Sequence, residues 1–243
     1  MEERLYRTFY DIEKSHWWFV ARQRILKDII ERRAKLAPGS RVLDIGCGTG
    51  AFLEMLSRDY QAYGTDSSSF AVELCRKRGL QHAYQCTLET FPHQALRFDL
   101  ITLLDVIEHI EHDAALLRQA SAFLKPGGCA IITVPAYQFL WSRHDEVNQH
   151  KRRYVKSTLR RVLEGSGFHI EMISYFNTIL FPAALASRLA ERIFRPAKDT
   201  TLDIPRPAVN KILTSIFAGE RLLLRALPLP YGLSLLAFCR RPV

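Results

Sequence analysis

Residues 42–50 read VLDIGCGTG, and this short stretch decides the fold. It is an apolar strand that ends in an acid and is followed by three glycines at alternate positions, Gly46, Gly48 and Gly50. Glycines at this spacing let the backbone turn sharply and approach a ligand where any Cβ would collide. Residues 51–58 then have the pattern of a helix whose N-terminus faces the same crevice. The stretch therefore predicts a nucleotide-like ligand at a strand-to-helix turn.

The glycine spacing and the acid before it distinguish between two kinds of nucleotide ligand. The pattern G-x-G-x-G differs from the dinucleotide pattern G-x-G-x-x-G. A carboxylate at Asp44 would repel a pyrophosphate, but it suits the cationic amino-acid end of S-adenosylmethionine. We therefore expect S-adenosylmethionine rather than NAD, with contacts from Asp44, Gly46, Cys47, Gly48 and Gly50.

The second predicted strand carries an acid that fits a nucleotide site. It lies in QAYGTDSSS (61–69), and Asp66 is about 20 residues beyond the glycine loop, where a βαβ unit places an acid on ribose hydroxyls. From about Arg41 to Tyr137 the sequence resembles the class I S-adenosylmethionine-dependent methyltransferases. The resemblance implies that Asp66 and the adjacent Ser67 bind the ribose.

Two further segments resemble the same family. In QCTLETFP (85–92) relatives usually carry an aspartate that holds the adenine amino group, whereas this chain has Thr87. The resemblance therefore implies adenine contacts at Thr87 and Leu88 without a charged partner. The segment FDLITLLDVIEHIEH (98–112) resembles the part of the family that lines the methionine end of the cofactor, and it implies a contact at Leu104.

The expected fold class is α/β. Alternation of strands and helices in the first half predicts a doubly wound, mostly parallel sheet with helices on both faces. The resemblance implies seven strands in the order 3-2-1-4-5-7-6, with the seventh antiparallel, and LKPGG (124–128) is expected as the turn into the fifth strand. The expected strands are 41–45, 60–64, 82–86, 98–104, 129–134, 168–175 and 233–239.

Two segments extend this minimal fold. We expect residues 1–36 to form an N-terminal helical cap and residues 37–243 to form the methyltransferase domain, which includes a helical insertion at 176–232. Within the insertion, residues 179–194 and 209–227 have apolar side chains at helical spacing. These two amphipathic helices could cover the sheet, form a substrate lid or lie on a membrane interface, and the sequence leaves all three open.

The N-terminal segment EKSHWWFVARQRIL (13–26) gathers aromatic side chains next to an arginine. An HWWF-x-x-R element is found in a bacterial subset of these methyltransferases, often encoded with enzymes of polysaccharide, glycolipid or lipid-linked intermediate synthesis. One interpretation is a cap over the cofactor, in which Trp18 or Phe19 excludes water and Arg22 pairs with the methionine carboxylate. The alternative is aromatic packing on the sheet with Arg22 exposed.

A second cluster, HDEVNQHKRRY (144–154), follows the fifth strand at the carboxyl edge of the sheet, where open α/β folds bind ligands. The same bacterial subset carries an H-D-x(4)-H-x-R-R-Y pattern here. We expect Arg152, Arg153 and Tyr154 to recognise an anionic acceptor, with a histidine as base or orienting group. The alternative is that Arg153 and Tyr154 pair internally and fix the loop.

Three histidines are the expected catalytic residues: His109, His144 and His150. His109 is the first choice as a base, because it follows the fourth strand at the usual position near the transferred methyl group in this family; its alternative role is structural. Glu108, Glu111 and His112 lie beside it and invite comparison with a metal site. Since the H-E-x-x-H spacing is absent, no metal ligand is assigned, and the sequence leaves open whether the protein uses a divalent ion.

Charge and composition bear on partners and compartment. The whole net charge of +9 lies after residue 140, which suggests an anionic acceptor or an anionic lipid surface, or else a solvated basic face. No nucleic-acid-binding module stands out, so we expect no nucleic-acid partner. Five cysteines without a C-x-x-C pair and a charged N-terminus favour the cytoplasm, with peripheral contact to the inner face of the membrane as an option.

These patterns together predict an S-adenosylmethionine-dependent methyltransferase that acts on oxygen of a small, saccharide-containing or lipid-linked acceptor. One alternative is a quinone-precursor O-methyltransferase, because LLDVIEHI (103–110) resembles the ubiquinone-pathway enzymes. Another is a cofactor-binding scaffold without turnover. The sequence assigns no oligomeric state and no acceptor atom.

Overall fold

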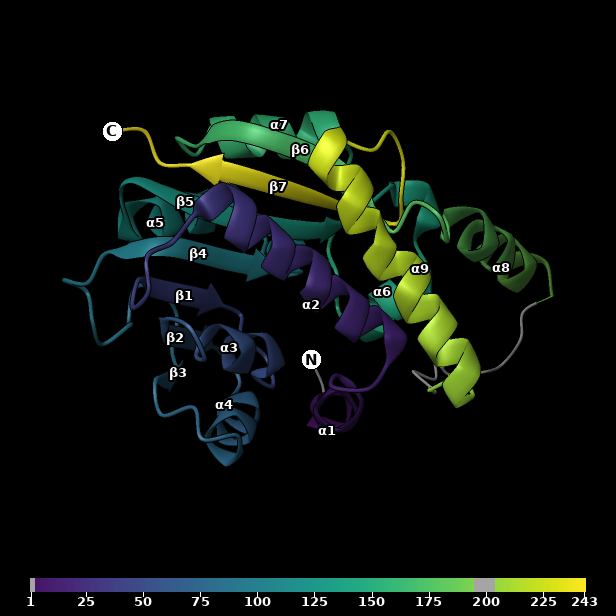
Figure 1. The fold of residues 1–243 in the computed structure, drawn as a ribbon, viewed down its shortest axis with the longest axis horizontal. Helices are drawn as coiled ribbons and strands as arrows, with labels where there is room; N and C mark the ends of the chain where they lie inside the picture. The colour runs from purple at the N-terminus through teal and green to yellow at the C-terminus, as the bar shows by residue number, and fades with distance from the viewer. Residues whose placement is uncertain (1–2, 195–203) are drawn as a thin grey trace.

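The computed structural model describes residues 3–194 and 204–243, and its centre is a seven-stranded sheet in the order β3-β2-β1-β4-β5-β7-β6 (Figure 1). β7 is antiparallel to both of its neighbours, and the other strands run parallel to one another. The predicted fold class and strand order are therefore confirmed. The strands are β1 (Arg41–Ile45), β2 (Gln61–Asp66), β3 (Ala83–Gln85), β4 (Phe98–Leu104), β5 (Leu124–Pro135), β6 (His169–Phe176) and β7 (Ser234–Arg240).

Side chains alternate along each central strand, and this alternation builds a core on each face of the sheet. Val42 of β1 and Leu100 of β4 belong to one core, whereas their neighbours Leu43 and Ile101 belong to the other. The first core is completed by α2 (Trp17–Ile29), α3 (Ala51–Leu56) and α9 (Pro207–Ala226), and the second by α5 (Asp113–Phe123) and α7 (Lys156–Glu164). α4 (Ser69–Lys77) packs beside β2 and β3.

One strand boundary departs from the sequence prediction by more than two residues. LKPGG was expected as a turn, but β5 begins at Leu124 and pairs with Phe98 before the register shifts. Gly127 has a φ of 75°, so the extra residues bulge out of the ladder, which then resumes at Cys129 opposite Leu100. The segment is thus an irregular start of a long strand.

The N-terminal residues form α1 (Glu3–Ile12), α2 and the π-helical turn η1 (Ile30–Ala34). His16 caps α2, because its Nδ1 accepts a hydrogen bond from the backbone N–H of Trp18 at 3.3 Å. α2 lies across the sheet and buries Ala21, Ile25 and Leu26 in the first core. α1 lies separately below it, beside the end of α2 that begins at Trp17 (Figure 1).

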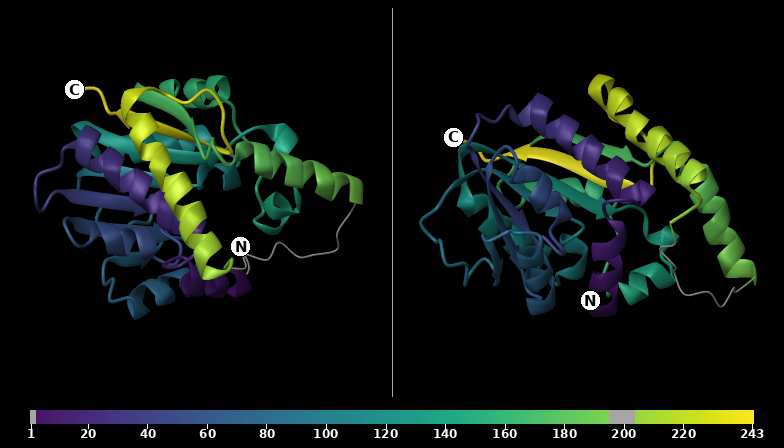
Figure 2. Two further views of the ribbon diagram at one scale, coloured as in Figure 1. Left: turned by 45° about the vertical axis from the view of Figure 1, so that its right-hand side comes forward. Right: turned by 60° about the horizontal axis from the view of Figure 1, so that its bottom comes forward.

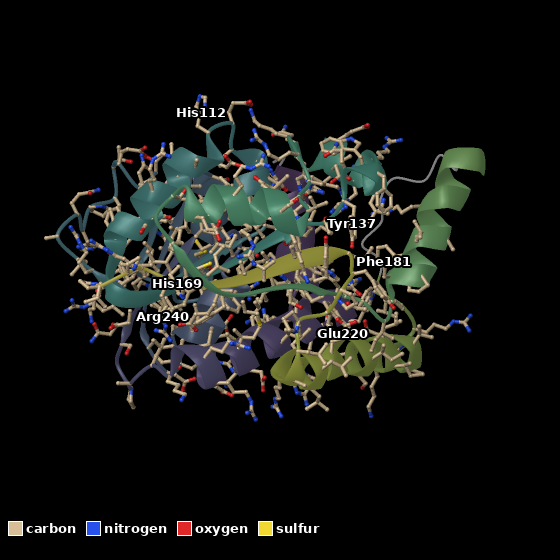
Figure 3. The ribbon with its side chains drawn as sticks, turned by 90° about the horizontal axis from the view of Figure 1, so that it is seen from above. His112, Tyr137, His169, Phe181, Glu220 and Arg240 are labelled. Carbon is tan, nitrogen blue, oxygen red and sulfur yellow. The ribbon has the colours of Figure 1, made fainter. Side chains whose placement is uncertain are left out.

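The insertion forms the two predicted helices, α8 (Phe181–Phe194) and α9, and the residues between them, 195–203, lie outside the described part. α9 covers α2 and the sheet: its Phe217 stacks on Phe176 with ring centres 5.9 Å apart, and Glu220 accepts hydrogen bonds from the backbone of Thr178 and Ile179 at 2.7 Å (Figures 1 and 3). α8 projects from the edge of the sheet (Figure 2). Among the described residues, no helix combines the length and the apolarity needed to cross a bilayer.

Candidate functional site

A cavity of about 1850 Å³ opens at the carboxyl ends of the parallel strands, between the glycine loop, α1, α2, the start of α6 (Arg143–Val147) and α8. Ligand pockets commonly measure roughly 300–1,000 Å³, so this one has room for a nucleotide and a second molecule together. Most of the predicted site residues line it. The predicted residues that line the cavity are Trp18, Arg22, Asp44, Gly46, Cys47, Gly48, Asp66, Ser67, Thr87, Leu88, Leu104, His109, His144, His150 and Arg153.

The three glycines of the loop differ in what they do. All have left-handed backbone angles, with φ of 69°, 54° and 86° for Gly46, Gly48 and Gly50. A Cβ on Gly46 would lie 2.6 Å from Val106, and one on Gly50 would lie 2.8 Å from Cys75, so these two glycines allow tight packing. Gly50 does not line the cavity. Gly48 has no neighbour within 4 Å of such a Cβ, so the backbone there is open to a ligand.

Asp66 ends β2 and is fixed by the loop that it faces. Its Oδ2 accepts a hydrogen bond from the N–H of Gly48 at 2.9 Å, and its Oδ1 accepts one from the N–H of Ser68 at 2.9 Å. Burial raises the pKa of Asp66, and these two backbone donors oppose that rise. The carboxylate is therefore preorganised at the cavity wall, with lone pairs left for hydroxyl donors.

Asp44 ends β1 and lies at the bottom of the cavity. It is 2% exposed, and its Oδ1 accepts a hydrogen bond from the hydroxyl of Thr102 at 2.6 Å. Burial raises the pKa of Asp44 to about 7. A buried carboxyl with a single hydroxyl partner favours a cationic ligand group, because such a group would stabilise its ionised form.

Arg22 of α2 reaches the carboxyl ends of β4 and β5. Its Nη2 lies 2.8 Å from a carboxylate oxygen of Asp105 and donates to the hydroxyl of Thr133 at 2.6 Å, and its guanidinium lies 4.9 Å from the ring centre of Trp18. Its Nε is buried and has no hydrogen-bond partner in the described structure. Arg22 therefore points into the cavity rather than into solvent.

Three residues of α1 and its following turn join this end of the cavity, and sequence reasoning missed them: Tyr6, Phe9 and Glu13. Glu13 accepts from the hydroxyl of Thr49 in the glycine loop and pairs with the buried Arg78. Arg78 in turn donates its Nε to the carbonyl of Thr49 at 2.8 Å. α1 is thus anchored to the glycine loop by a buried ion pair, which no local motif in the sequence could reveal.

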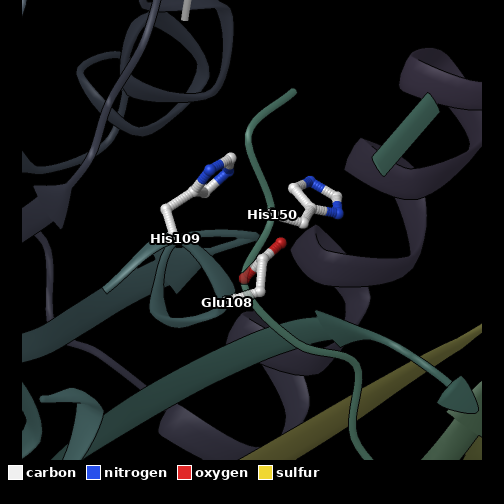
Figure 4. A group of neighbouring side chains, drawn as sticks. All are labelled: Glu108, His109 and His150. Atoms are coloured by element: carbon white, nitrogen blue, oxygen red, sulfur yellow. The ribbon is translucent and has the colours of Figure 1, made fainter. Parts of the chain in front are cut away.

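The other end of the cavity is built from histidines. His109 and His150 have ring centres 4.7 Å apart (Figure 4), and the ring centres of His144 and His150 are 6.1 Å apart. Burial lowers the pKa of His109 and of His144 to about 4, so both imidazoles are neutral at pH 7. Neutral imidazoles can accept a proton or bind a cation.

Asp145 organises the segment that carries two of these histidines. It is fully buried, and its carboxylate accepts from Nδ1 of His150 at 2.8 Å and from Nε and Nη2 of Arg153 at 2.8 and 2.9 Å. The backbone N–H of Ser142 donates to the same carboxylate at 2.8 Å. Arg153 therefore has the internal pairing that the sequence left open as an alternative.

Two of the three predicted substrate residues lie outside the cavity. Tyr154 is 3% exposed, and its hydroxyl donates to Asp113 at 2.7 Å. Arg152 lies on the outer surface and pairs with Asp113 and Glu111 at 3.5 and 3.6 Å. The cationic side chains that line the histidine end of the cavity, besides Arg153, are Arg143, Lys151 and Arg188.

Comparisons with known proteins agree with this geometry. A family model described as a methyltransferase domain matches residues 19–173. The chain is 33% identical over 131 residues to tRNA (carboxymethyluridine(34)-5-O)-methyltransferase of Macaca fascicularis, a match that covers 53% of this chain and 18% of that protein. It is 32% identical over 131 residues to ubiquinone biosynthesis O-methyltransferase of Marinobacter nauticus, a match that covers 47% and 55%. The chain thus spans less than two thirds of the length of these curated relatives.

A solved structure shares the fold. Phosphoethanolamine N-methyltransferase 2 of Haemonchus contortus, in complex with S-adenosyl-L-methionine, superposes with a TM-score of 0.56 at 19% identity. The alignment covers 98% of this chain and 60% of that one. The aligned region therefore extends beyond the residues that the family model matches.

Proposed function

The chain belongs to the methyltransferase domain family, and from that premise we propose that it transfers the methyl group of S-adenosylmethionine to an oxygen of a small anionic or lipid-linked acceptor. The observation that carries the proposal is the single cavity with two chemically different ends. One end has the open glycine backbone and two carboxylates. The other has imidazoles and cationic side chains.

The residues at the first end fit the cofactor. The carboxylate of Asp66 would accept hydrogen bonds from the ribose, and Gly48 leaves space for the ligand beside it. Asp44 would face the ammonium group. The unpartnered Nε of Arg22 is a buried donor that a carboxylate would satisfy, which supports a contact with the methionine carboxylate.

The reaction then depends on alignment. When bound, S-adenosylmethionine supplies an electrophilic methyl group, whose bond to sulfur breaks as the bond to the acceptor oxygen forms, so the acceptor loses its proton. His109, His144 and His150 line the end where that proton must leave. Asp145 holds the ring of His150 in one orientation through Nδ1, which keeps the acceptor end rigid.

Charge supports an anionic acceptor. Arg143 and Arg188 line the cavity beside His144, and the guanidinium of Arg188 donates to the hydroxyl of Ser142. A guanidinium matches phosphate and carboxylate geometry by donating two parallel hydrogen bonds. Two basic residues of the second half of the chain therefore line the site itself.

A lipid-linked acceptor has a separate supporting observation. α9 exposes Ile212, Leu222 and Leu223, and the exposed Lys211 lies beside Ile212, so its outer face is apolar with a basic residue at the side. Such a face suits the surface of an anionic bilayer. Peripheral contact with a membrane would bring a lipid-borne acceptor to the cavity.

A quinone precursor is the second candidate acceptor, and the likeness to ubiquinone biosynthesis O-methyltransferases favours it. A phenol carries an acidic hydroxyl, which needs little help to lose its proton.

The test has two stages. Calorimetry should show that S-adenosylmethionine binds in the micromolar range while NAD does not bind. Mass spectrometry of ligands copurified with the protein, followed by methyl transfer to a panel of sugar phosphates, lipid-linked saccharides and phenols, should then identify the acceptor. Cofactor binding without methylation of any compound in the panel would favour the scaffold alternative.

A further inference from the structure

Glu108, His109 and His150 form a compact group at the acceptor end of the cavity (Figure 4). Glu108 and His109 belong to η2 (Ile107–His109), the turn after β4, whereas His150 follows α6, so only the fold brings the three together. One ligand atom from each lies within 4.8 Å of the others. The site proposed above needs no such arrangement to hold its cofactor.

The carboxylate of Glu108 is the member that needs explanation. The side chain is fully buried, and neither of its oxygens has a hydrogen-bond partner in the described structure. A buried carboxyl without a hydrogen-bond partner has lost its hydration without compensation from the protein. Such a group in a native protein needs an explanation, and a bound ion is one that would satisfy both oxygens.

Both histidines have their second ring nitrogen occupied by an oxygen acceptor. Nδ1 of His150 donates to Asp145 at 2.8 Å, and the ring of His109 is hydrogen-bonded to the backbone carbonyl of Gln149. Histidines that bind a metal characteristically donate their other N–H to a carboxylate or a backbone carbonyl. The other nitrogen of each ring is not used by these two acceptors.

The surrounding charges are balanced except at Glu108. Arg22 pairs with Asp105 at 2.8 Å, and Arg153 pairs with Asp145 at 2.8 Å. Each nearby guanidinium thus already has its own carboxylate. An ionised Glu108 would leave one negative charge without a partner, and a cation would neutralise it.

We propose that Glu108, His109 and His150 hold a divalent transition-metal ion of the Zn²⁺ class, which polarises the acceptor oxygen during methyl transfer. Two imidazoles and one carboxylate with an open position are the donor set of catalytic zinc sites. Bonds of about 2.0–2.2 Å place neighbouring ligand atoms about 3–3.5 Å apart, so small side-chain rotations from the observed spacing complete the site.

The ion deepens the proposed function and rests on it. An acceptor hydroxyl in the open position would lose its proton more readily, because a bound cation stabilises the oxyanion. The protein then needs no strong base at this end of the cavity. The inference also narrows the acceptor class to compounds whose reactive oxygen can bind a metal ion, such as phenols with a neighbouring oxygen.

Metal binding can be measured without any methyl transfer. Zn²⁺ titrated into the metal-free protein by calorimetry should bind at one site, and Glu108→Gln should weaken that binding by about 10–100-fold. Glu111→Gln and His112→Ala are matched controls, because both are exposed residues of the same segment, and Figure 3 places His112 at the periphery. The controls should bind Zn²⁺ as the unchanged protein does.

A second variant and a second ligand keep the test decisive. His150→Gln should weaken Zn²⁺ binding to a similar extent, and the melting temperatures of all variants separate loss of the site from loss of the fold. Unchanged Zn²⁺ affinity in Glu108→Gln, or no site in the unchanged protein, overturns the metal proposal. Binding of S-adenosylmethionine by the same samples then tells whether the methyltransferase proposal survives it.

Discussion

The guanidinium of Arg22 lies 2.8 Å from the carboxylate of Asp105, yet its Nε, buried at the cavity wall, has no partner in the described structure. One half of the side chain is thus fixed by the sheet, and the other half is left to a ligand. Because the ion pair already orders the side chain, a ligand that binds to the free Nε should cause little further loss of side-chain entropy.

Arg22→Ala should weaken the binding of S-adenosylmethionine by about 10–100-fold, in line with the loss of a charge-assisted hydrogen bond. Methylthioadenosine lacks the methionine carboxylate, so its affinity should barely change. Calorimetry with both ligands measures the difference, and Arg24→Ala, an exposed arginine of the same helix, is the control. Equal losses for the two ligands would mean that Arg22 acts only on the fold.

Asp66→Asn should weaken S-adenosylmethionine binding by about 1–3 kcal/mol, because a neutral amide makes weaker hydrogen bonds to ribose hydroxyls. Asp59→Asn changes an exposed acid outside the cavity and should leave the affinity as it was. If calorimetry finds the same affinity for S-adenosylmethionine in both variants, Asp66 does not bind the cofactor.

Gly48→Ala and Gly39→Ala form a matched pair. Both glycines have left-handed φ angles, of 54° and 76°, and neither has a neighbour within 4 Å of an added Cβ. Each substitution should lower the free energy of unfolding by about 1 kcal/mol through backbone strain. Only Gly48→Ala should also weaken cofactor binding, since only Gly48 lines the cavity.

The carboxyl of Asp44 should make stability fall as pH rises from about 4 to 7. Burial raises its pKa from 3.8 to about 7, so the folded protein holds a proton that the unfolded chain has already released in this window. The shift of about 3 units corresponds to roughly 4 kcal/mol at most. Asp44→Asn should lose this slope in denaturant unfolding measured across the window.

Binding of the cofactor should be coupled to the release of a proton from the same carboxyl. A cationic ammonium favours the ionised form of Asp44, so S-adenosylmethionine should displace a proton near pH 6, and its affinity should rise with pH up to about 7. Calorimetry in buffers with different ionisation enthalpies counts the proton. Asp44→Asn with an unchanged proton count would assign the linkage to another group.

Neutralising the cavity arginines should affect the acceptor and spare the cofactor. Arg143→Gln with Arg188→Gln should raise the acceptor KM or lower kcat about tenfold or more, whereas the affinity for S-adenosylmethionine stays the same. Arg152→Gln is the control, because Arg152 pairs with Glu111 and Asp113 outside the cavity.

Vesicles separate the two sources of an anionic acceptor. Salt-sensitive cosedimentation with phosphatidylserine vesicles would support a membrane-borne acceptor, and no cosedimentation would leave a soluble one. If the Arg143→Gln, Arg188→Gln variant kept full activity on an identified acceptor and the protein did not bind vesicles, the basic residues of the second half would only form a solvated surface.

The first half of the fold could be predicted because its signals are local. The boundaries of β1 and β4 agree with the prediction at both ends, since each is a continuous apolar run that polar and turn residues terminate. The start of β5 was wrong for the opposite reason: a Pro-Gly-Gly run predicts a turn, and only pairing with Phe98 makes it a bulged strand.

The residues of the site also fall into those that could be predicted from the sequence and those that could not. The glycine loop, Asp44 and Asp66 could be placed from spacing alone, because backbone geometry fixes where such residues face. The internal role of Asp145 and the isolation of Glu108 depend on which polar atoms meet across the fold. Sequence shows that such residues exist, but it does not show which of them lack partners.

The side chain of Asn210 joins two distant parts of the chain, and this affects the order of events on the ribosome. Its Oδ1 accepts from the N–H of Trp17 at 2.8 Å, and its Nδ2 donates to the carbonyl of Ser15, across 193 and 195 residues. At synthesis rates of about 5–20 residues per second, α2 waits roughly 10–40 s for the helix that covers it. During that interval the apolar side of α2 is one that a nascent-chain chaperone can bind, so translation speed and chaperone supply should influence the yield of folded protein.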